Sequence, residues 1–386
     1  MSRTDLPRLA ILGAGPIGLE AALQAAVLGL PFTVYERGRI GEYLRQWGHV
    51  RLFSPFGANS TALGKARVRA DHPQHTLPGD NAILSGREHV SAYLEPLAQS
   101  PLLREHLRTQ TTVVQVGRRG LLKEEMAGDV RRAQHPFLLL VRSDKREVIE
   151  EADVVLDGTG TYGQARSLGD GGIAAIGESS ARPHIAWGLE DVLGERSAVY
   201  ADKTTVVIGS GYSAATSVCN LAKLAEKHSA TWVIWLASGG ATQPIKRFVN
   251  DSLKERDQLA VRANQLATRG DGNVEFHAQT IVTAIECAGA DKGFSVRALR
   301  AGKATTWTSD RLIANVGYAP DESLYRELQS PEANYFILGV KSYGRDSSFL
   351  LRDGFEQVHE TFRQITNSAD MLSRFPGLRQ PRKVSA

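Results

Sequence analysis

The stretch LAILGAGPIGLEAALQAAVLGLPFTVYE, residues 9–36, decides the fold of this 386-residue chain. It opens with an apolar run at residues 9–12, which is typical of a buried parallel strand. An apolar segment of helical length follows at residues 17–28, and residues 32–35 are typical of a second strand. The order strand, glycine-rich turn, helix and strand predicts a βαβ unit.

The glycines of this turn are spaced for a dinucleotide. Gly13 permits the tight turn out of the strand, Gly15 lets the main chain approach a pyrophosphate, and Gly18 lets the helix pack close to the sheet. The helix N-terminus favours the negative charge of that pyrophosphate. Glu36 ends the second strand, where a carboxylate binds a ribose 2′-hydroxyl. The stretch therefore predicts a dinucleotide-binding site.

Composition argues against several other classes of protein. The chain has 46 basic and 42 acidic side chains, and a net charge of +4 is too small for its length to indicate a nucleic-acid partner. Its two cysteines, Cys219 and Cys287, form no CxxC pair, which favours a reducing compartment. We expect a cytoplasmic protein, because no stretch approaches the roughly 20 apolar residues of a membrane span and the N-terminus lacks a signal-peptide pattern.

The same pattern occurs a second time further along the chain. A buried strand at residues 204–208 is followed by GSGYSAATS (Gly209 to Ser217), a helix, and a strand at residues 231–236. In both copies a predicted hairpin leads to another strand, which ends in DGTGTYG (residues 157–163) or NVGYAPD (residues 315–321). This internal duplication predicts two nucleotide ligands in one chain.

The second copy differs from the first in two places that bear on its ligand. Ala214 stands where the third glycine would be, and the strand after the helix ends at Ala237 and Ser238 rather than at an acid. Without a carboxylate nothing there repels a ribose 2′-phosphate, which favours NADPH. NADH stays open as the alternative, because the nearest basic residues, Lys246 and Arg247, come further along the loop.

The sequence also predicts the local structure of three segments between these motifs. WGHVRLFSP, residues 47–55, alternates like a half-buried strand, or else forms a wall beside a flat cofactor ring. Residues 58–80 are typical of a surface excursion, and residues 85–98 of a core-facing helix that begins at a serine cap. The excursion contains three potential metal ligands, Asp71, His72 and His75. We interpret these side chains as solvated, so no metal site is expected.

A third landmark, YFILGVKSYGRDSSFLLRDGFEQV, occupies residues 335–358. An apolar strand at residues 335–338 reaches Gly339, a turn with Lys341 follows, and a helix is expected to begin around Ser348. That helix N-terminus either faces developing negative charge on a reduced flavin ring or belongs to an ordinary strand-to-helix turn.

With these motifs the chain resembles the two-dinucleotide-binding-domain flavoproteins. These include the pyridine nucleotide-disulfide reductases, the flavin-containing monooxygenases and the N-hydroxylating monooxygenases. The first glycine turn with Glu36 matches their FAD motif, the second glycine turn matches their NADPH motif, and residues 158–160 and 315–317 are similar to their two hinge motifs. The second hinge departs from the usual pattern, with Asn315 and Val316 in place of Ala and Thr. Residues 47–55, 85–98 and 339–358 look more specifically like a subgroup of FAD-dependent oxidoreductases.

The resemblance implies an α/β fold with two Rossmann-like domains, as in glutathione reductase, in which the NAD(P)H domain is inserted into the FAD domain. We expect the FAD-binding domain at residues 1–165 and 310–386, the NAD(P)H-binding domain at residues 195–309, and a hinge at residues 166–194. The residues expected to contact the two nucleotides are Gly13, Gly15, Pro16, Ile17, Gly18, Glu36, Arg37, Trp47, Ser54, Val114, Gly158, Thr159, Gly160, Gly209, Ser210, Gly211, Tyr212, Ser213, Ala214, Ser238, Gly317, Gly339, Lys341, Ser342, Phe349 and Leu350.

Two departures from the family narrow the chemistry. Many relatives have Gly-Asp near the flavin ribitol, whereas this chain has Gly339 and Val340, leaving Lys341 or main-chain groups to replace the aspartate. The cysteine pair that disulfide reductases place against the flavin is absent, which excludes disulfide reduction through a protein dithiol.

The resemblance implies an FAD-dependent oxidoreductase whose flavin is reduced by NADPH. We expect a monooxygenase that acts through a flavin hydroperoxide on a small soluble substrate with a nitrogen, sulfur or carbonyl centre. Oxygen is the second substrate, and the candidates for the general acid are His49, Arg51 and Lys341. One alternative is a reductase or oxidase that passes electrons to an external acceptor or to oxygen, and another is a non-catalytic redox sensor. No nucleic-acid or membrane partner is expected, and the family favours a homodimer.

Overall fold

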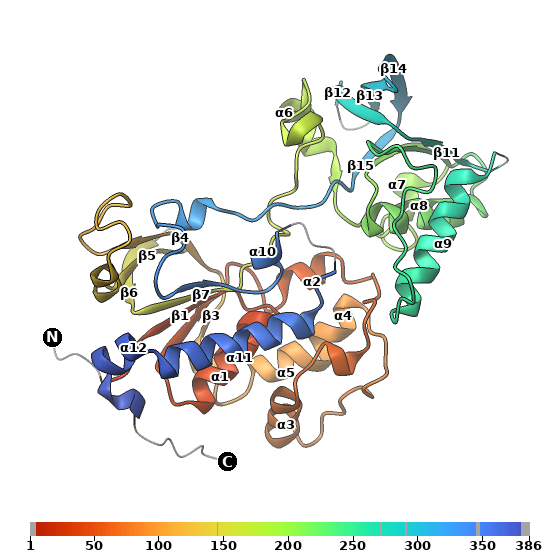
Figure 1. Ribbon diagram of the computed structural model, residues 1–386. Coiled ribbons are helices and arrows are strands. Elements are labelled where there is room, and N and C mark those ends of the chain that lie inside the picture. The colour runs from red at the N-terminus through yellow and green to blue at the C-terminus, as the bar shows by residue number, and fades with distance from the viewer. Residues whose placement is uncertain (1–4, 145, 271, 290–291, 345–347, 380–386) are drawn as a thin grey trace. The chain divides into compact units, whose positions relative to one another are not determined.

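The computed structural model describes residues 5–379 except 145, 271, 290–291 and 345–347 (Figure 1). The chain forms two compact units. Unit 1 comprises Met1–Gly163 and Ala319–Ala386, and unit 2 comprises Gln164–Tyr318. No helix in the described part of the chain is long and apolar enough to cross a membrane.

A five-stranded parallel sheet forms the centre of unit 1, in the order β16-β7-β1-β2-β3. Both edges of β1 are paired, so that Leu9 lies opposite Phe32 of β2 and Val154 of β7. Every residue of β1 is buried, which explains why its sequence is continuously apolar instead of alternating. The strands are β1 (Leu9–Leu12), β2 (Phe32–Tyr35), β3 (Leu107–Arg108), β7 (Val154–Asp157) and β16 (Tyr335–Ile337).

Two long helices cover this sheet. Helix α1 (Pro16–Val27) packs against both the sheet and α11 (Leu351–Asn367), and the two helices lie side by side in Figure 1. Most of α1 is buried, and its sequence is accordingly apolar around most of its circumference. Helix α12 (Ala369–Arg374) follows α11 and adds Met371 to the same core.

Short helices build the rest of unit 1 and correct three predictions. The expected strand at residues 47–55 is wrong, because this segment is a series of turns in which Arg51 alone bridges to Ser85. Residues 58–80 are not only a surface excursion, because Thr61 caps a helix there by accepting a hydrogen bond from the Gly64 amide. These helices are α2 (Glu42–Gln46), α3 (Ala62–Asp71), α4 (Gly86–His89), α5 (Glu95–Ala98) and α10 (Val340–Tyr343).

The helix predicted at residues 85–98 is confirmed. Ser85 and Glu88 form a reciprocal capping box at its start, and a π-helical turn at Val90–Leu94 joins α4 to α5. The third correction concerns the landmark after β16. It forms the short helix α10 instead of a plain turn, and α11 begins at Leu351, three residues after the predicted start at Ser348.

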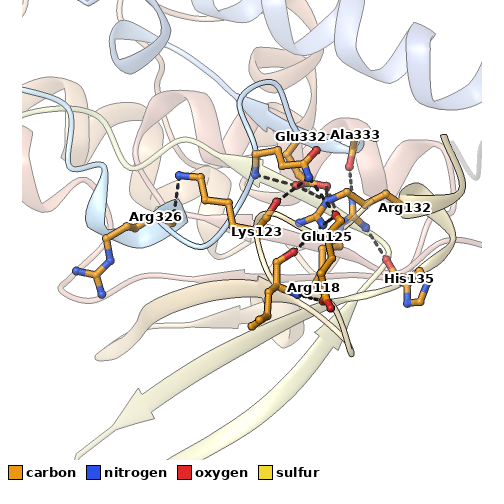
Figure 2. A network of polar contacts seen from close by, with 10 residues as sticks. Arg118, Lys123, Glu125, Arg132, His135, Arg326, Glu332 and Ala333 are labelled. Atoms are coloured by element: carbon orange, nitrogen blue, oxygen red, sulfur yellow. Dashed lines mark hydrogen bonds and ion pairs between the residues drawn. The ribbon is translucent and has the colours of Figure 1, made fainter. Parts of the chain in front are cut away.

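An antiparallel meander of three strands completes unit 1, and a buried ionic network fixes the loop within it. Figure 2 shows Glu332 between the guanidinium groups of Arg118 and Arg132. Glu332 Oε1 accepts from Nε of Arg118 at 2.9 Å and from Nε of Arg132 at 3.1 Å. Arg118 also donates to the His135 carbonyl and Arg132 to the Leu122 and Glu125 carbonyls. The strands are β4 (Thr111–Arg118), β5 (Phe137–Ser143) and β6 (Arg146–Ala152).

Unit 2 contains a second parallel sheet in the order β11-β10-β9-β15-β8 and a second antiparallel meander, β12-β13-β14. Helices α8 (Tyr212–Ala225) and α9 (Lys254–Thr268) pack against its central strands through one apolar cluster. Two short helices are α6 (Glu178–Ala181) and α7 (Ser197–Tyr200). The strands are β8 (Ala186–Trp187), β9 (Thr204–Ile208), β10 (Trp232–Leu236), β11 (Val274–His277), β12 (Thr280–Cys287), β13 (Phe294–Arg300), β14 (Lys303–Ser309) and β15 (Arg311–Ala314).

The predicted duplication is confirmed by the two topologies. In each unit the strand before the glycine turn, β1 or β9, has the next strand of the chain on one side and the strand after the meander on the other. The meanders even share an irregularity: the register shifts around the fourth residue of the first meander strand, which is Val114 in β4 and Thr283 in β12. The fifth strand breaks the symmetry, since β16 follows the other strands of unit 1 in sequence and β8 precedes those of unit 2.

Candidate functional site

The two glycine turns lie where an open α/β sheet binds its ligands. In unit 1 the chain leaves β1 toward β2 and later returns to β7 on the other side of β1, so the strand order reverses between β1 and β7. In unit 2 the same reversal lies between β9 and β15. Ligands of such sheets bind outside the carboxyl ends of the strands at this reversal. The turns that begin at Gly13 and Gly209 lie at these two points.

The first glycine turn is packed tightly underneath and open at the helix N-terminus. Gly13 has a φ of +93°, and a Cβ there would lie 2.9 Å from the Gly158 carbonyl oxygen. A Cβ on Gly18 would collide with the Gly13 carbonyl oxygen, so this helical position also needs glycine. By contrast, a Cβ on Gly15 would meet nothing within 4 Å, which leaves room for a group bound at the start of α1. This arrangement fits a pyrophosphate.

Glu36 is held beside this turn by two main-chain amides. Its Oε2 accepts from the Ala14 amide at 2.8 Å and its Oε1 from the Gly38 amide at 2.7 Å. The side chain is buried, and each carboxylate oxygen retains a further lone pair for a ribose hydroxyl. Arg37, the next residue, places its guanidinium 5.0 Å from the centre of the Tyr43 ring.

The segment after α2 supplies two polar atoms that lack partners. Trp47 Nε1 and His49 Nε2 are buried and have no hydrogen-bond partner among the described residues. Orphaned buried polar atoms are costly, so their presence fits a polar group that binds beside them. Ser54 is engaged within its own segment, since its hydroxyl donates to Asn59 Oδ1 at 2.7 Å. Arg51 is exposed and donates to the Ile83 carbonyl.

A buried ion pair joins the end of β7 to helix α10. Lys341 Nζ donates to Asp157 Oδ2 at 2.7 Å and to Thr159 Oγ1 at 3.1 Å, and both charged side chains are buried. Asp157 also accepts from the Tyr335 hydroxyl at 2.8 Å and from the Thr159 hydroxyl at 2.6 Å. The hydrogen bonds of Asp157 and Lys341 fix the Gly-Thr-Gly turn that follows β7. Burial of the Tyr335 hydroxyl, together with the negative charge of Asp157, raises the pKa of Tyr335 above its usual range.

The other residues expected at the first site lie between β16 and α11, at the start of α1, in the turn after β7 and in β4. The Gly339 amide donates to Gln357 Oε1 and the Ser342 hydroxyl to the Gly339 carbonyl, which closes the turn after β16. Phe349 packs its ring 5.1 Å from that of Tyr343, and Leu350 donates its amide to the Asp353 carboxylate. Pro16 and Ile17 begin α1, Gly160 has a φ of +68° in the turn after β7, and Val114 lies at the β4 register shift.

The second glycine turn is built on the same plan. Gly209 has a φ of +141°, and a Cβ there would collide with the Asn315 carbonyl oxygen, as one on Gly13 would approach Gly158. A Cβ on Gly211 would meet nothing within 4 Å, so the start of α8 is open as well. The remaining expected contacts are Tyr212 and Ser213 at the start of α8, buried Ala214, exposed Ser210 and Ser238, and Gly317 with a φ of +82°.

Asn315, where the sequence departs from the expected hinge pattern, has a structural role that the sequence did not reveal. Its side chain is buried, donates to the Gly188 carbonyl at 2.6 Å and accepts from the Ser217 hydroxyl at 2.7 Å. These bonds connect the end of β15 to α8 and to the residue after β8. Ala237, which follows β10, is uncharged, whereas Glu36 stands at the matching position after β2. The second turn therefore lacks a carboxylate that would repel a ribose 2′-phosphate.

Among the described residues, neither the cysteines nor the potential metal ligands form a second kind of reactive centre. Cys219 and Cys287 both belong to unit 2 and neither forms a disulfide. Burial raises the pKa of the Cys219 thiol to about 11, which keeps it protonated at neutral pH. Among the residues that the structure describes, no group of three or more His, Cys, Asp or Glu side chains is arranged to hold a metal ion.

Comparisons with known proteins agree with this architecture. The sequence model of the family described as pyridine nucleotide-disulphide oxidoreductase matches residues 10–123, which include the first glycine turn, Glu36 and the unpaired Trp47 and His49. No curated protein matches the chain significantly. The expected resemblance is confirmed for this segment.

Solved structures match nearly the whole chain at low sequence identity. Bacillithiol disulfide reductase Bdr (YpdA) from Bacillus cereus is 18% identical with a TM-score of 0.67, covering 93% of this chain and 98% of that one. Ornithine hydroxylase (PvdA) from Pseudomonas aeruginosa is 16% identical with a TM-score of 0.62, covering 93% and 99%. DfoA, a cadaverine monooxygenase from Erwinia amylovora, is 13% identical with a TM-score of 0.60, covering 100% and 99%. The predicted fold with two Rossmann-like domains is confirmed.

Proposed function

We propose that the protein is an FAD-dependent oxidoreductase that takes reducing equivalents from NADPH and acts as a monooxygenase on a small nitrogen-, sulfur- or carbonyl-containing substrate. The observation that carries this proposal is the pair of open glycine turns. The Glu36 carboxylate lies beside the first turn, whereas the strand next to the second turn, β10, is followed by uncharged Ala237. The carboxylate suits the ribose of FAD, and the uncharged strand end suits the phosphorylated ribose of NADPH. Two turns that fit two different dinucleotides support transfer of hydride from one to the other.

In this proposal unit 1 holds FAD with the residues described above. Gly13, Gly15 and the start of α1 bind the pyrophosphate, Glu36 binds the adenosine ribose, and Trp47 and His49 donate to polar atoms of the cofactor. Bound flavin supplies the capacity to accept hydride and to activate oxygen. Asp157 and Lys341 keep the Gly-Thr-Gly turn after β7 in one conformation, so the chain itself contributes orientation and a fixed electrostatic environment.

Of the three candidates for a general acid, His49 has the most suitable surroundings. Its Nε2 is buried and unpartnered among the described residues, so that nitrogen is free to donate to a bound group. Lys341 already donates to Asp157 and Thr159, and we assign it a positioning role. Arg51 is exposed and donates to a main-chain carbonyl, and a guanidinium does not release its proton near neutral pH.

The second candidate function is a reductase that passes electrons to an external acceptor. The similarity to Bdr, a bacillithiol disulfide reductase, favours this second function, because the match covers 93% of this chain and 98% of Bdr. The cysteines oppose a protein dithiol, since the chain has only two, both in unit 2, and Cys219 is buried with a raised pKa. A reductase of this chain would therefore transfer electrons from flavin to the acceptor without a protein disulfide.

The deciding experiment measures the stoichiometry of NADPH, oxygen and hydrogen peroxide. Purified holoprotein is first reduced anaerobically with NADPH while the flavin absorbance is recorded, and oxygen is then admitted with and without candidate amines, sulfides and ketones. A monooxygenase consumes one oxygen per NADPH and releases less peroxide when its substrate is present. The reductase does not oxygenate these compounds, so with oxygen as its only acceptor it releases one peroxide per NADPH with every one of them. A protein that binds no FAD, or whose flavin NADPH does not reduce, contradicts both functions.

The role of His49 is tested separately with His49→Gln. We expect anaerobic reduction by NADPH to proceed at the wild-type rate, whereas the oxygen-dependent step slows about a hundredfold, the lower end of a general-acid contribution. His75→Gln is the matched control, because His75 lies in the loop after α3 and contacts the Ala92 carbonyl. Equal rates in His49→Gln and wild type would contradict the assignment.

A further inference from the structure

The loop between β10 and α9 returns to the second glycine turn. Ile245 is buried, and Asn264 of α9 fixes its main chain by accepting from its amide and donating to its carbonyl, both at 2.9 Å. Immediately afterwards, the Tyr212 hydroxyl donates to the Lys246 carbonyl at 2.8 Å. Tyr212 is the first residue of α8, so this bond holds the main chain of Lys246 one tyrosine side chain away from the helix N-terminus where the pyrophosphate would bind.

Within the described part of the chain, the charged residues of this loop form ion pairs except for Lys246. Arg247 forms a bidentate pair with Asp257, at 2.8 and 2.9 Å. Arg256 forms another with Asp251, at 2.7 and 2.8 Å. The exposed Lys246 ammonium has no carboxylate partner among the described residues, and it lies 5.4 Å from the centre of the Phe248 ring. The five charges of this group therefore leave one positive charge, on Lys246.

We propose that Lys246 binds the ribose 2′-phosphate of NADPH and makes unit 2 selective for NADPH over NADH. This inference rests on the proposed function, because it requires a nicotinamide dinucleotide at the second glycine turn. The ribose lies at the end of β10, where Ala237 offers no carboxylate, and the flexible stem of Lys246 starts from an anchored main chain beside that turn. The neighbouring Arg247 does not take this role, since both its bonds go to Asp257.

The sequence alone does not distinguish these two adjacent cations. Only the folded loop shows that Arg247 points into an ion pair on α9 and that Lys246 is left over. An exposed ammonium attracts a phosphate by charge with little geometric demand, so arginine at position 246 would serve as well. Ionic strength screens this attraction, so binding of NADP⁺ weakens with added salt more steeply than binding of NAD⁺.

The test compares Lys246→Gln with the matched control Arg247→Gln in the FAD-loaded protein. Isothermal titration calorimetry measures the affinities of NADP⁺, NAD⁺, adenosine 2′,5′-bisphosphate and 5′-AMP, so the result does not depend on turnover. We expect Lys246→Gln to bind both 2′-phosphorylated ligands roughly tenfold more weakly and the two unphosphorylated ligands unchanged. Arg247→Gln and Lys246→Arg are expected to retain the wild-type preference.

The outcomes separate this inference from the function on which it rests. If wild type binds neither NADP⁺ nor NAD⁺, the proposed function fails and the inference fails with it. If wild type prefers NADP⁺ and Lys246→Gln keeps that preference, the function stands and the inference is overturned. A preference lost in Arg247→Gln but kept in Lys246→Gln would also overturn it and would transfer the role to Arg247.

Discussion

Units 1 and 2 share one topology but stabilise equivalent turns by different means. In unit 1 the strand after the meander ends in Asp157, whose buried carboxylate binds Lys341. The equivalent strand of unit 2 ends in Ala314, and the next residue, Asn315, binds Ser217 and a main-chain carbonyl through neutral hydrogen bonds. The same backbone turn is thus held once by an ion pair and once by an amide. Breaking a buried ion pair on one side costs more than breaking a neutral hydrogen bond.

The meanders show the same contrast. The last residue of β4 is Arg118, which binds buried Glu332, whereas the last residue of β12 is Cys287. Unit 1 therefore has buried charges at the last residues of both β7 and β4. Duplication preserved the backbone down to a shared register shift, and the two sets of polar side chains differ at these equivalent positions.

The largest expected effect comes from breaking the Asp157–Lys341 pair. Lys341→Met leaves a buried carboxylate without its cation, and we expect it to lower the free energy of unfolding by about 3–5 kcal/mol. Ser217→Ala, the matched change in unit 2, removes one neutral bond and is expected to cost about 1 kcal/mol. Urea unfolding followed by circular dichroism measures both. The double variant Asp157→Leu/Lys341→Met should recover most of the loss, and equal effects of the two single changes would refute the contrast.

The next effect is the acid sensitivity of unit 1. His89 is buried against Phe56 and Tyr93, and burial lowers its pKa from 6.5 to about 4. The pKa of His89 is lower in the folded than in the unfolded protein, so the unfolded state binds a proton first as the pH falls. The free energy of unfolding is therefore highest above pH 6.5 and decreases as the pH falls to about 4. The shift corresponds to about 3 kcal/mol.

His89→Phe should remove this pH dependence, which unfolding experiments between pH 4 and 7 would detect. The comparison in unit 2 is His277, where burial lowers the pKa but the neighbouring Glu275 raises it in part. His277→Phe is therefore expected to change the pH dependence less than His89→Phe does. The opposite order would show that the two histidines have been assigned the wrong roles.

A smaller effect distinguishes the third positions of the two glycine turns. Gly18→Ala places a methyl group against the Gly13 carbonyl, and we expect a loss of about 1–3 kcal/mol together with weaker retention of FAD. Ala214→Gly is expected to cost only about 1 kcal/mol, through the lower helix propensity of glycine. Thermal unfolding and the flavin-to-protein absorbance ratio measure these outcomes. A Gly18→Ala protein with wild-type flavin content would contradict the close packing of this turn.

The smallest effect concerns the carboxylate that only the first turn has. Glu36→Gln replaces one acceptor oxygen with an amide that faces a main-chain N–H, and we expect FAD to bind about tenfold more weakly. Ala237→Glu puts a carboxylate at the matching position of unit 2 and should lower the NADP⁺ to NAD⁺ affinity ratio by a similar factor. Fluorescence titration measures both. An unchanged ratio in Ala237→Glu would refute the proposed placement of the ribose.

The sequence by itself determined the two βαβ units, because close packing leaves little choice at their turns. Gly13, Gly18 and Gly209 occupy positions where a side chain would strike the backbone. Strands β1, β2 and β9 have the predicted bounds, because buried parallel strands are continuously apolar. The duplication followed from the repeated order of these patterns. The sequence was less informative at residues 47–55, where alternation resembled a strand, and before α11, where α10 was missed.

Only the tertiary structure decided which side chains are partners. Asp157 and Lys341 are 184 residues apart, and Arg118 and Glu332 are 214 apart, so no local pattern could pair them. The same holds for Lys246, whose difference from Arg247 arises from Asp257 and Tyr212 in other elements. Backbone constraints act between near neighbours and are readable along the chain, whereas the partner of a charged group depends on which segments the fold brings together.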